Sequence, residues 1–262
     1  MLPNSLRTRA VFFAYLFGPP RFVRRAEASQ ISEAVCSALM QDDLVFQYNT
    51  TDVGLKPSTA GFSIKLERRE GRGGVKIDID NPGPTAPMRF VVVYEWPPSL
   101  QHVKEVFDLA SKAVFESLQG SWQRVMAEVR FRAQCDAESG DGLGFIRRHA
   151  VGFSSELVDS LGQPLVFGAV KLEVAQSGSV DDSLANPKRE ISVEALREDP
   201  HSVYIELMSQ WAQFPQPAGA SAAVDMTHLR KIEDEPSVYV EESYHFLTEK
   251  VLVLGSKEGR CQ

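Results

Sequence analysis

Alternation of apolar and polar residues predicts a β-hairpin in the first third of the chain. Apolar residues take every second position over Phe62–Glu67 and again over Val75–Asp80. The connection between these segments contains Gly71, Gly73 and Gly74, which supply the positive-φ positions that a turn requires. A shift of one residue would move the polar set into the core, so the pattern predicts two antiparallel strands, each with one wet face.

A central strand and a long helix are predicted after the hairpin. Arg89–Trp96 is nearly all apolar, as is typical of a strand that is buried on both faces. Two prolines end it, and Ser99 is a suitable N-cap for a helix over Ser99–Leu118, whose apolar residues form one broad stripe. An earlier helix is predicted over Glu27–Met40, because its apolar residues recur at helical spacing.

The remaining segments follow the same order of element types in both halves. A strand is predicted to begin each half, over Ala10–Phe17 and Val125–Gln134, and a helix to end each half, the second over Pro236–Leu252. The other predicted elements are a short strand, Leu44–Tyr48, a short helix, Ser154–Leu161, and the strands Leu165–Ala175, Glu190–Leu196 and Ser202–Gln210.

This repeated order predicts the fold class α+β, with two tandem β-α-β(3-4)-α units. The predicted domains are residues 1–120 and 121–262, each an antiparallel sheet covered by its long C-terminal helix. Paired units of this kind make one continuous sheet with helices on one side. The sequence leaves open whether the two halves share one sheet.

Composition narrows the class of protein. The 262 residues carry a net charge of −7, which argues against non-specific nucleic-acid binding and favours a partner with a basic surface. Cys36, Cys135 and Cys261 are widely separated and lack metal-ligand spacing, so a reducing cytoplasm is expected. No apolar run approaches the length of a membrane span.

One dense cationic triplet outside the N-terminal segment is a candidate partner-binding site. Arg147, Arg148 and His149 follow one another. Arginine offers planar, bidentate donors, so the triplet is suited to an anionic ligand or an acidic partner. The alternative is a strand edge whose charges discourage aggregation.

Acid–base chemistry has a weaker candidate in Asp78 and Asp80. Residues two apart on a strand point to the same side, so both carboxylates are expected on one face, as in an acid–base pair, a cation site or an ordinary wet strand face. The glycine-rich segments near residues 71–74 and 140–144 lack the strand-to-helix context of phosphate-binding loops. The sequence therefore assigns no catalytic residue, cofactor or metal ligand.

The predicted order of elements resembles a tandem helix-grip arrangement of the TATA-binding-protein-like type. The resemblance depends on the hairpin Phe62–Asp80, on Arg89–Trp96 with Ser99–Leu118, and on Leu165–Gln210 with Pro236–Leu252. The pattern also resembles a sporadically distributed family of uncharacterised bacterial proteins. Neither resemblance implies catalytic residues.

Three functions remain as hypotheses. The first is a non-enzymatic binding protein that recognises a macromolecular partner, most simply a protein, in bacterial conflict or immunity. The second is a small-molecule binder, or a lyase- or cyclase-like enzyme, that uses a cavity between helix and sheet. The third is an RNA-processing protein of tandem ferredoxin-like fold, against which the net charge argues.

Overall fold

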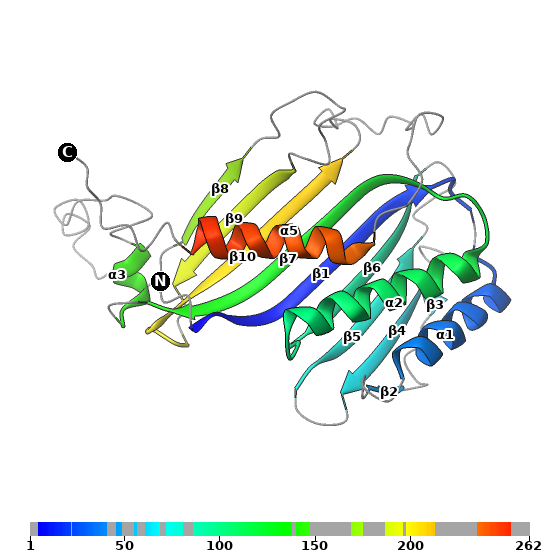
Figure 1. The fold of residues 1–262 in the computed structure, drawn as a ribbon, viewed down its shortest axis with the longest axis horizontal. Coiled ribbons are helices and arrows are strands. Elements are labelled where there is room, and N and C mark those ends of the chain that lie inside the picture. Colours follow the sequence, from blue (N-terminus) through cyan, green and yellow to red (C-terminus); the bar gives the residue numbers. More distant parts are fainter. Residues whose placement is uncertain are drawn as a thin grey trace.

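A computed structural model gives the arrangement of the chain. It describes residues 5–21, 23–40, 46–48, 55–56, 61–68, 72–80, 86–137, 140–146, 169–174, 187–195, 198–212 and 235–252. The described strands form one open, ten-stranded antiparallel sheet, and three helices lie side by side on one of its faces (Figure 1). The architecture is therefore α+β and rich in sheet.

The sheet runs in the order β2-β4-β5-β6-β1-β7-β10-β9-β8, with β3 also paired to β4. Its strands in chain order are β1 (Arg7–Gly18), β2 (Phe46–Tyr48), β3 (Leu55–Lys56), β4 (Gly61–Arg68), β5 (Gly74–Asp80), β6 (Met88–Glu95), β7 (Gln123–Asp136), β8 (Ala169–Val174), β9 (Lys188–Ala195) and β10 (Ser202–Ala212).

Two long strands, β1 and β7, lie at the centre of the sheet. They pair with each other from Arg7 opposite Gln134 to Gly18 opposite Gln123. Each also pairs on its other side, β1 with β6 and β7 with β10, and all of these pairs are antiparallel. Both are therefore interior strands with a neighbour on each side; β1 carries a long apolar run, whereas polar and apolar residues alternate along β7.

The helical layer consists of α1 (Arg25–Leu39), α2 (Leu100–Leu118) and α5 (Pro236–Phe246), which continues as a π-helix, η6 (Leu247–Val251). The helix α2 packs between α1 and α5, and α5 lies over β7 and β10 (Figure 1). A further short helix, α3 (Gly142–Phe145), lies at one end of the sheet.

Aromatic rings fill the space between the helices and the centre of the sheet. Phe13 on β1 contacts Phe107 on α2 and Tyr239 on α5, with ring centroids 6.1 Å apart in both pairs. Two residues along, Tyr15 contacts Tyr239 as well. These rings are essentially inaccessible to water, so the core is a single layer that α2 and α5 share.

The prediction of two tandem units, each covered by its own long C-terminal helix, is wrong. The strands of both halves belong to one sheet that is joined through β1 and β7, and α2 and α5 pack on each other above it. The terminal helix covers nearly the predicted range, but only Pro236–Phe246 is α-helical, and Leu247–Val251 is a π-helix. Local periodicity identifies a strand but carries no information about which distant strand it pairs with.

Most individual elements were predicted correctly. The hairpin is β4 and β5, the apolar strand is β6, and Ser99 caps α2 by accepting a hydrogen bond from the backbone N–H of His102 at 3.1 Å. Two short elements, β3 and α3, were missed because they lie in segments rich in loop-forming residues. The predicted helix Ser154–Leu161 lies outside the described residues.

None of the helices in the described ranges combines the length and the apolar character needed to cross a bilayer.

Candidate functional site

One face of the sheet is covered by the helices, and the opposite face is the helix-free face. Alternate residues of each strand point to this helix-free face. On β1, the residues that alternate with Phe13 and Tyr15 point away from the helices, among them Phe12. On β10, Trp211 contacts Tyr239 of α5, so Glu206, Met208 and Gln210 lie on the helix-free face. No described helix covers this face.

The middle of this face carries a network that we call the central charge cluster, made of Glu128, Arg130 and Arg132 on β7 and Glu206 and Gln210 on β10. The guanidinium of Arg130 lies 3.0 Å from Glu128 and 3.4 Å from Glu206. Arg132 lies 3.4 Å from the other oxygen of Glu206, and Gln210 donates a hydrogen bond of 2.7 Å to Glu128. Both carboxylates are thus held by two partners each.

Strand register explains why these residues meet. Arg132 lies directly opposite Glu206 across the β7–β10 pair, and Glu128 lies directly opposite Gln210. Cross-strand neighbours on one face have Cβ atoms about 5 Å apart, which suits opposite charges. The guanidinium of Arg130 also lies 5.5 Å above the ring of Phe12, which adds a cation–π contact across to β1.

A second polar chain runs along one end of the sheet. Arg9 donates to Gln134 at 3.0 Å, and Gln134 donates to Asp199 at 2.7 Å. Ser202 donates a further hydrogen bond of 2.7 Å to Asp199. The hydrogen bond from Ser202 lowers the pKa of Asp199 most, and the backbone N–H of His201 and the amide of Gln134 lower it further.

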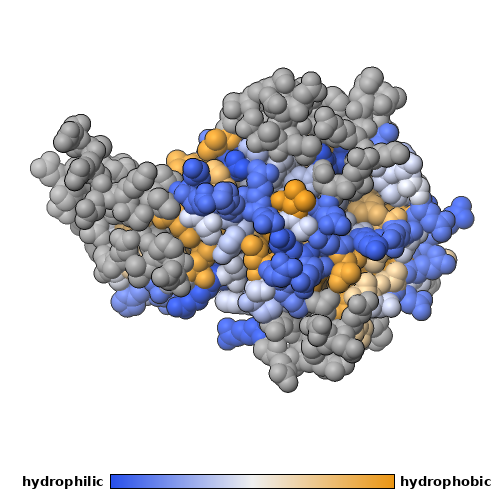
Figure 2. Space-filling model, in the orientation of Figure 1, coloured by the Kyte–Doolittle hydropathy of each residue, from blue (hydrophilic) through white to orange (hydrophobic). Residues whose placement is uncertain are grey.

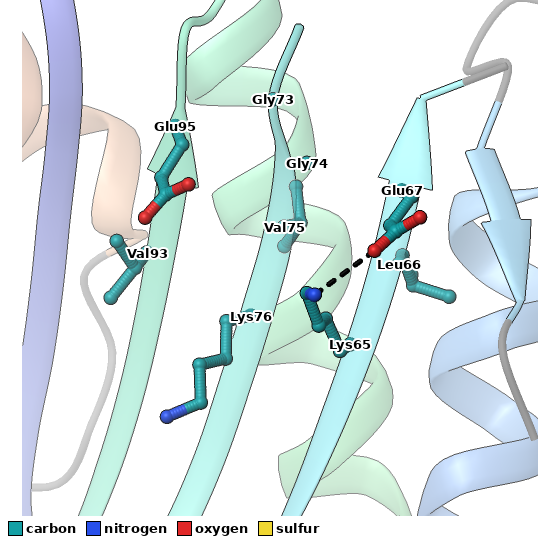
Figure 3. Close-up of a pocket in the computed structure, with 9 residues that line it drawn as sticks. All are labelled: Lys65, Leu66, Glu67, Gly73, Gly74, Val75, Lys76, Val93 and Glu95. Carbon is teal, nitrogen blue, oxygen red and sulfur yellow. Dashed lines mark ion pairs between the residues drawn. The ribbon is translucent and has the colours of Figure 1, made fainter. Parts of the chain in front are cut away.

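A shallow pocket of about 300 Å³ opens on the helix-free face where β4, β5 and β6 lie side by side (Figure 3). Its charged residues come from all three strands: Lys65 pairs with Glu67 at 2.9 Å, Lys76 rises from β5, and Glu95 ends β6. Position 73 requires glycine for two reasons: its φ is 100°, and a Cβ there would collide with the carbonyl oxygen of Glu95. The lining of the pocket therefore carries both positive and negative side chains.

A separate opening of about 340 Å³ lies on the helical side, between the start of β1, the start of α2 and α5. Its wall is apolar at Val11, Val103 and Phe131 and polar at Arg7 and Tyr244. Arg7 is largely exposed and lies 3.7 Å from Asp136. This opening lies between the helical layer and the sheet.

A half-buried ion pair fastens α5 to the sheet. The guanidinium of Arg189 on β9 lies 2.8 Å from Glu242 and stacks 4.1 Å from the ring of Phe246. Burial raises the pKa of Glu242 and lowers that of Arg189, and the attraction between the two charges opposes both shifts. The pair positions α5 and does not open toward the helix-free face.

The predicted cationic triplet Arg147, Arg148 and His149 lies outside the described residues, so its placement is not described. Asp78 and Asp80 lie on the same face of β5, as the strand period requires. Asp78 is engaged there: it accepts a hydrogen bond from Ser63 and pairs with Lys76 at 2.9 Å. This arrangement is that of a paired strand face rather than of two adjoining carboxylates.

Cysteine thiols and metal-binding groups are the other reactive features that a site could use. Burial raises the pKa of the Cys36 and Cys135 thiols to about 11, so both are protonated at neutral pH and are poor nucleophiles. Within the described part of the chain, no group of three or more His, Cys, Asp or Glu side chains is arranged to hold a metal ion.

The sequence analysis did not predict the central charge cluster, although three of its five residues alternate along one predicted strand. Glu128, Arg130 and Arg132 occupy alternate positions of a predicted strand. Their partners Glu206 and Gln210 lie on a strand far along the chain, and only the β7–β10 register brings them together. Charged residues at every second position of this long strand were the feature that could have indicated a polar face with paired charges.

The chain was also compared with known proteins. No protein-family model matches it, and no curated protein matches it.

Proposed function

We propose that this chain is a non-catalytic binding protein that recognises a protein partner through the helix-free face of its sheet, in bacterial conflict or immunity. The observation that carries the proposal is the central charge cluster, in which Arg130 is held by Glu128 and Glu206 and stacks on Phe12. The cluster lies on the neighbouring strands β7 and β10, near the middle of the sheet face that no described helix covers.

Preorganisation supports recognition. Binding costs less when interface side chains are already fixed, and each immobilised long side chain saves roughly 0.5–1.5 kcal/mol. Arg130 is fixed by two carboxylates, by the Phe12 ring and by the sulfur of Met208 at 3.3 Å. Arginine beside an aromatic ring is also the composition enriched at the centres of protein interfaces.

The pattern of charges favours a protein over a nucleic acid. Positive and negative side chains alternate across β7, β10 and β9, so the face offers no continuous basic path along which a phosphate backbone would lie. The net charge of −7 adds a general attraction for a partner with a basic surface. Mixed charge on the cluster would then fix the orientation of that partner.

The test is quantitative capture of partners from the native host with three forms of the chain. Arg132→Glu reverses a half-exposed charge of the cluster, whereas Lys112→Glu makes the same charge change on the exposed side of α2. We expect one protein to be recovered in stoichiometric amount with the wild type and with K112E, and at least about tenfold less with R132E. Recovery that is equal for all three forms, or no stoichiometric protein with the wild type, would contradict the proposal.

A second candidate function is binding of a small molecule in the opening between β1, α2 and α5. The observation in its favour is the combination of an apolar wall with Arg7 and Tyr244, which suits a small amphipathic anion. A thermal-shift screen of carboxylates and phosphates tests it, with Arg7→Gln as the variant. A ligand that stabilises the wild type and R7Q equally would argue against this site.

A further inference from the structure

The outer edge of β8 combines exposed apolar side chains with charged ones. Among the described strands β8 pairs on one side only, with β9. Leu172 and Val174 are each 48% exposed, although they lie on the same face as core residues: Leu172 is opposite Ile191, which is buried. Figure 2 shows apolar surface at the edge where Figure 1 places β8. Exposed, extended and partly apolar edges of this kind are templates for pairing with another strand.

The sequence of β8 is complementary to itself when it is read in the opposite direction. If a second β8 pairs antiparallel about a twofold axis at Leu172, each Leu172 meets its own copy. Val170 then meets Val174 of the second copy, and Lys171 meets Glu173. In each of the three pairs, both residues lie on the same face of the joined sheet. Lys171 and Glu173 lie on the helix-free face, and the apolar residues lie on the helical face.

Pairing of the two strands about a neighbouring residue is less stable, because it places like charges opposite each other. A shift of the axis to Lys171 would place Lys171 opposite its own copy, and a shift to Glu173 would place Glu173 opposite its own copy. Like charges directly opposite each other destabilise a strand pair, whereas opposite charges and apolar pairs stabilise it. The centre at Leu172 is therefore favoured over both of these alternatives, and a twofold pairing closes on itself and leaves no further β8 edge for growth.

Two carboxylates that face each other across the β8–β9 pair are compensated by lysines of the same chain. Glu173 lies directly opposite Glu190 across the β8–β9 pair. Lys188 bridges both carboxylates, at 2.7 Å and 3.3 Å, and Lys171 lies 2.7 Å from Glu190. In the β8–β8 pair, Lys171 of the second copy would lie directly opposite Glu173 and would add a second cation beside Lys188.

We infer that β8 is a dimerisation strand, through which two copies of this chain join their sheets about a twofold axis at Leu172. The interaction surface is the β8 edge, separate from the central charge cluster on β7 and β10. Six residues on each side make a small interface, so the dimer is reversible, with a dissociation constant expected in about the micromolar range.

Sedimentation equilibrium over a wide concentration range tests this dimer. In Lys171→Glu and in Glu173→Lys, both symmetry-related contacts become like-charged, and we expect dimerisation to weaken by roughly tenfold or more. The double variant K171E/E173K restores opposite charges in the same register and should recover the wild-type dissociation constant. Lys112→Glu and Glu116→Lys make the same changes of net charge on exposed positions of α2 and should leave dimerisation unchanged.

A monomeric wild type at every concentration would overturn the inference, as would single variants that dimerise normally or a double variant that fails to recover. Circular dichroism confirms that each variant is folded. As an independent readout, Leu172→Cys should give a covalent dimer under mild oxidation, because directly opposite residues of antiparallel strands lie within disulfide distance. Val238→Cys, at a position of α5 that is at least as exposed as Leu172, and the wild type should not; equal cross-linking of all three would count against the β8 interface.

Discussion

Arg189 on β9 and Glu242 on α5 form an ion pair of 2.8 Å that joins the helical layer to the sheet. The guanidinium also stacks on Phe246, one turn further along the same helix. Both charged groups are partly removed from water, so each depends on the other for compensation of its lost hydration.

We predict that Arg189→Met destabilises the protein by about 1–3 kcal/mol at pH 7, less than a fully buried pair would lose, because Glu242 stays partly hydrated. Burial raises the pKa of Glu242 in the folded state, and loss of Arg189 raises it further. The folded state then takes up a proton more readily than the unfolded state, so the destabilisation should shrink as the pH falls toward and below the ordinary carboxyl pKa. Urea unfolding at pH 7 and pH 4.5 measures this.

The double variant R189M/E242Q is the control for that prediction. Because it removes both charges, it should be more stable than R189M at pH 7 and should lose the difference between the two pH values. A single variant with the same stability as the wild type at both pH values would show that the pair does not hold α5.

A second prediction concerns the shared aromatic core. Phe13→Ala removes a ring that contacts α2 and α5 together, so we expect a loss of about 3–5 kcal/mol in the free energy of unfolding. Val238→Ala removes apolar atoms from a residue that is 56% exposed and should change it by no more than about 0.5 kcal/mol. Chemical denaturation compares the two, and similar effects would argue against the packing described here.

A third prediction concerns Asp199. Its pKa is lowered chiefly by the hydrogen bond from Ser202, so Ser202→Ala should raise that pKa, as an NMR titration of the side-chain carboxyl would record. A lowered folded-state pKa contributes stability above the unfolded value, and this contribution is lost as the pH falls through the folded value. The difference in stability between wild type and S202A should therefore diminish below about pH 4. An unchanged pKa in S202A would disprove the assignment.

A fourth prediction concerns thiol reactivity. Burial raises the pKa of Cys36 and Cys135 to about 11, so alkylation of both at pH 8 should be far slower in the native protein than in the unfolded chain. Peptide mapping after a short exposure to iodoacetamide distinguishes the individual sites. Rapid native labelling of Cys135, which is inaccessible to water, would contradict the placement of β7 inside the sheet.

The sequence was sufficient to predict helices and strands that are determined by residues close together in the chain. The hairpin follows from the alternation over 62–80, and the start of α2 follows from Ser99, whose side chain accepts the hydrogen bond expected of a cap. The pairing of β1 with β7 has no local cause, since it joins segments separated by more than a hundred residues. For this reason the division into two tandem units was wrong, although most strands were predicted correctly.

The candidate site was likewise predictable only in part: the residues that alternate on one strand could be seen in the sequence, but their partners on other strands could not. The wet face of β7 was visible in the sequence as Glu128, Arg130 and Arg132, but the ring of Phe12 and the carboxylate of Glu206 come from two other strands. A patterned strand indicates that a surface exists. Only the order and register of its neighbours determine what that surface presents.

The central claim is that the helix-free face is the recognition surface, and a footprint of the native complex tests it most directly. Hydrogen–deuterium exchange is unsuited to interior strands that are already protected, so oxidative labelling of side chains is the better measurement. We predict that complex formation protects Phe12, Met126 and Met208, which lie on that face, and leaves the exposed residue Val238 on α5 unchanged. Protection confined to α2 and α5, with unchanged labelling of the three sheet residues, would contradict the account.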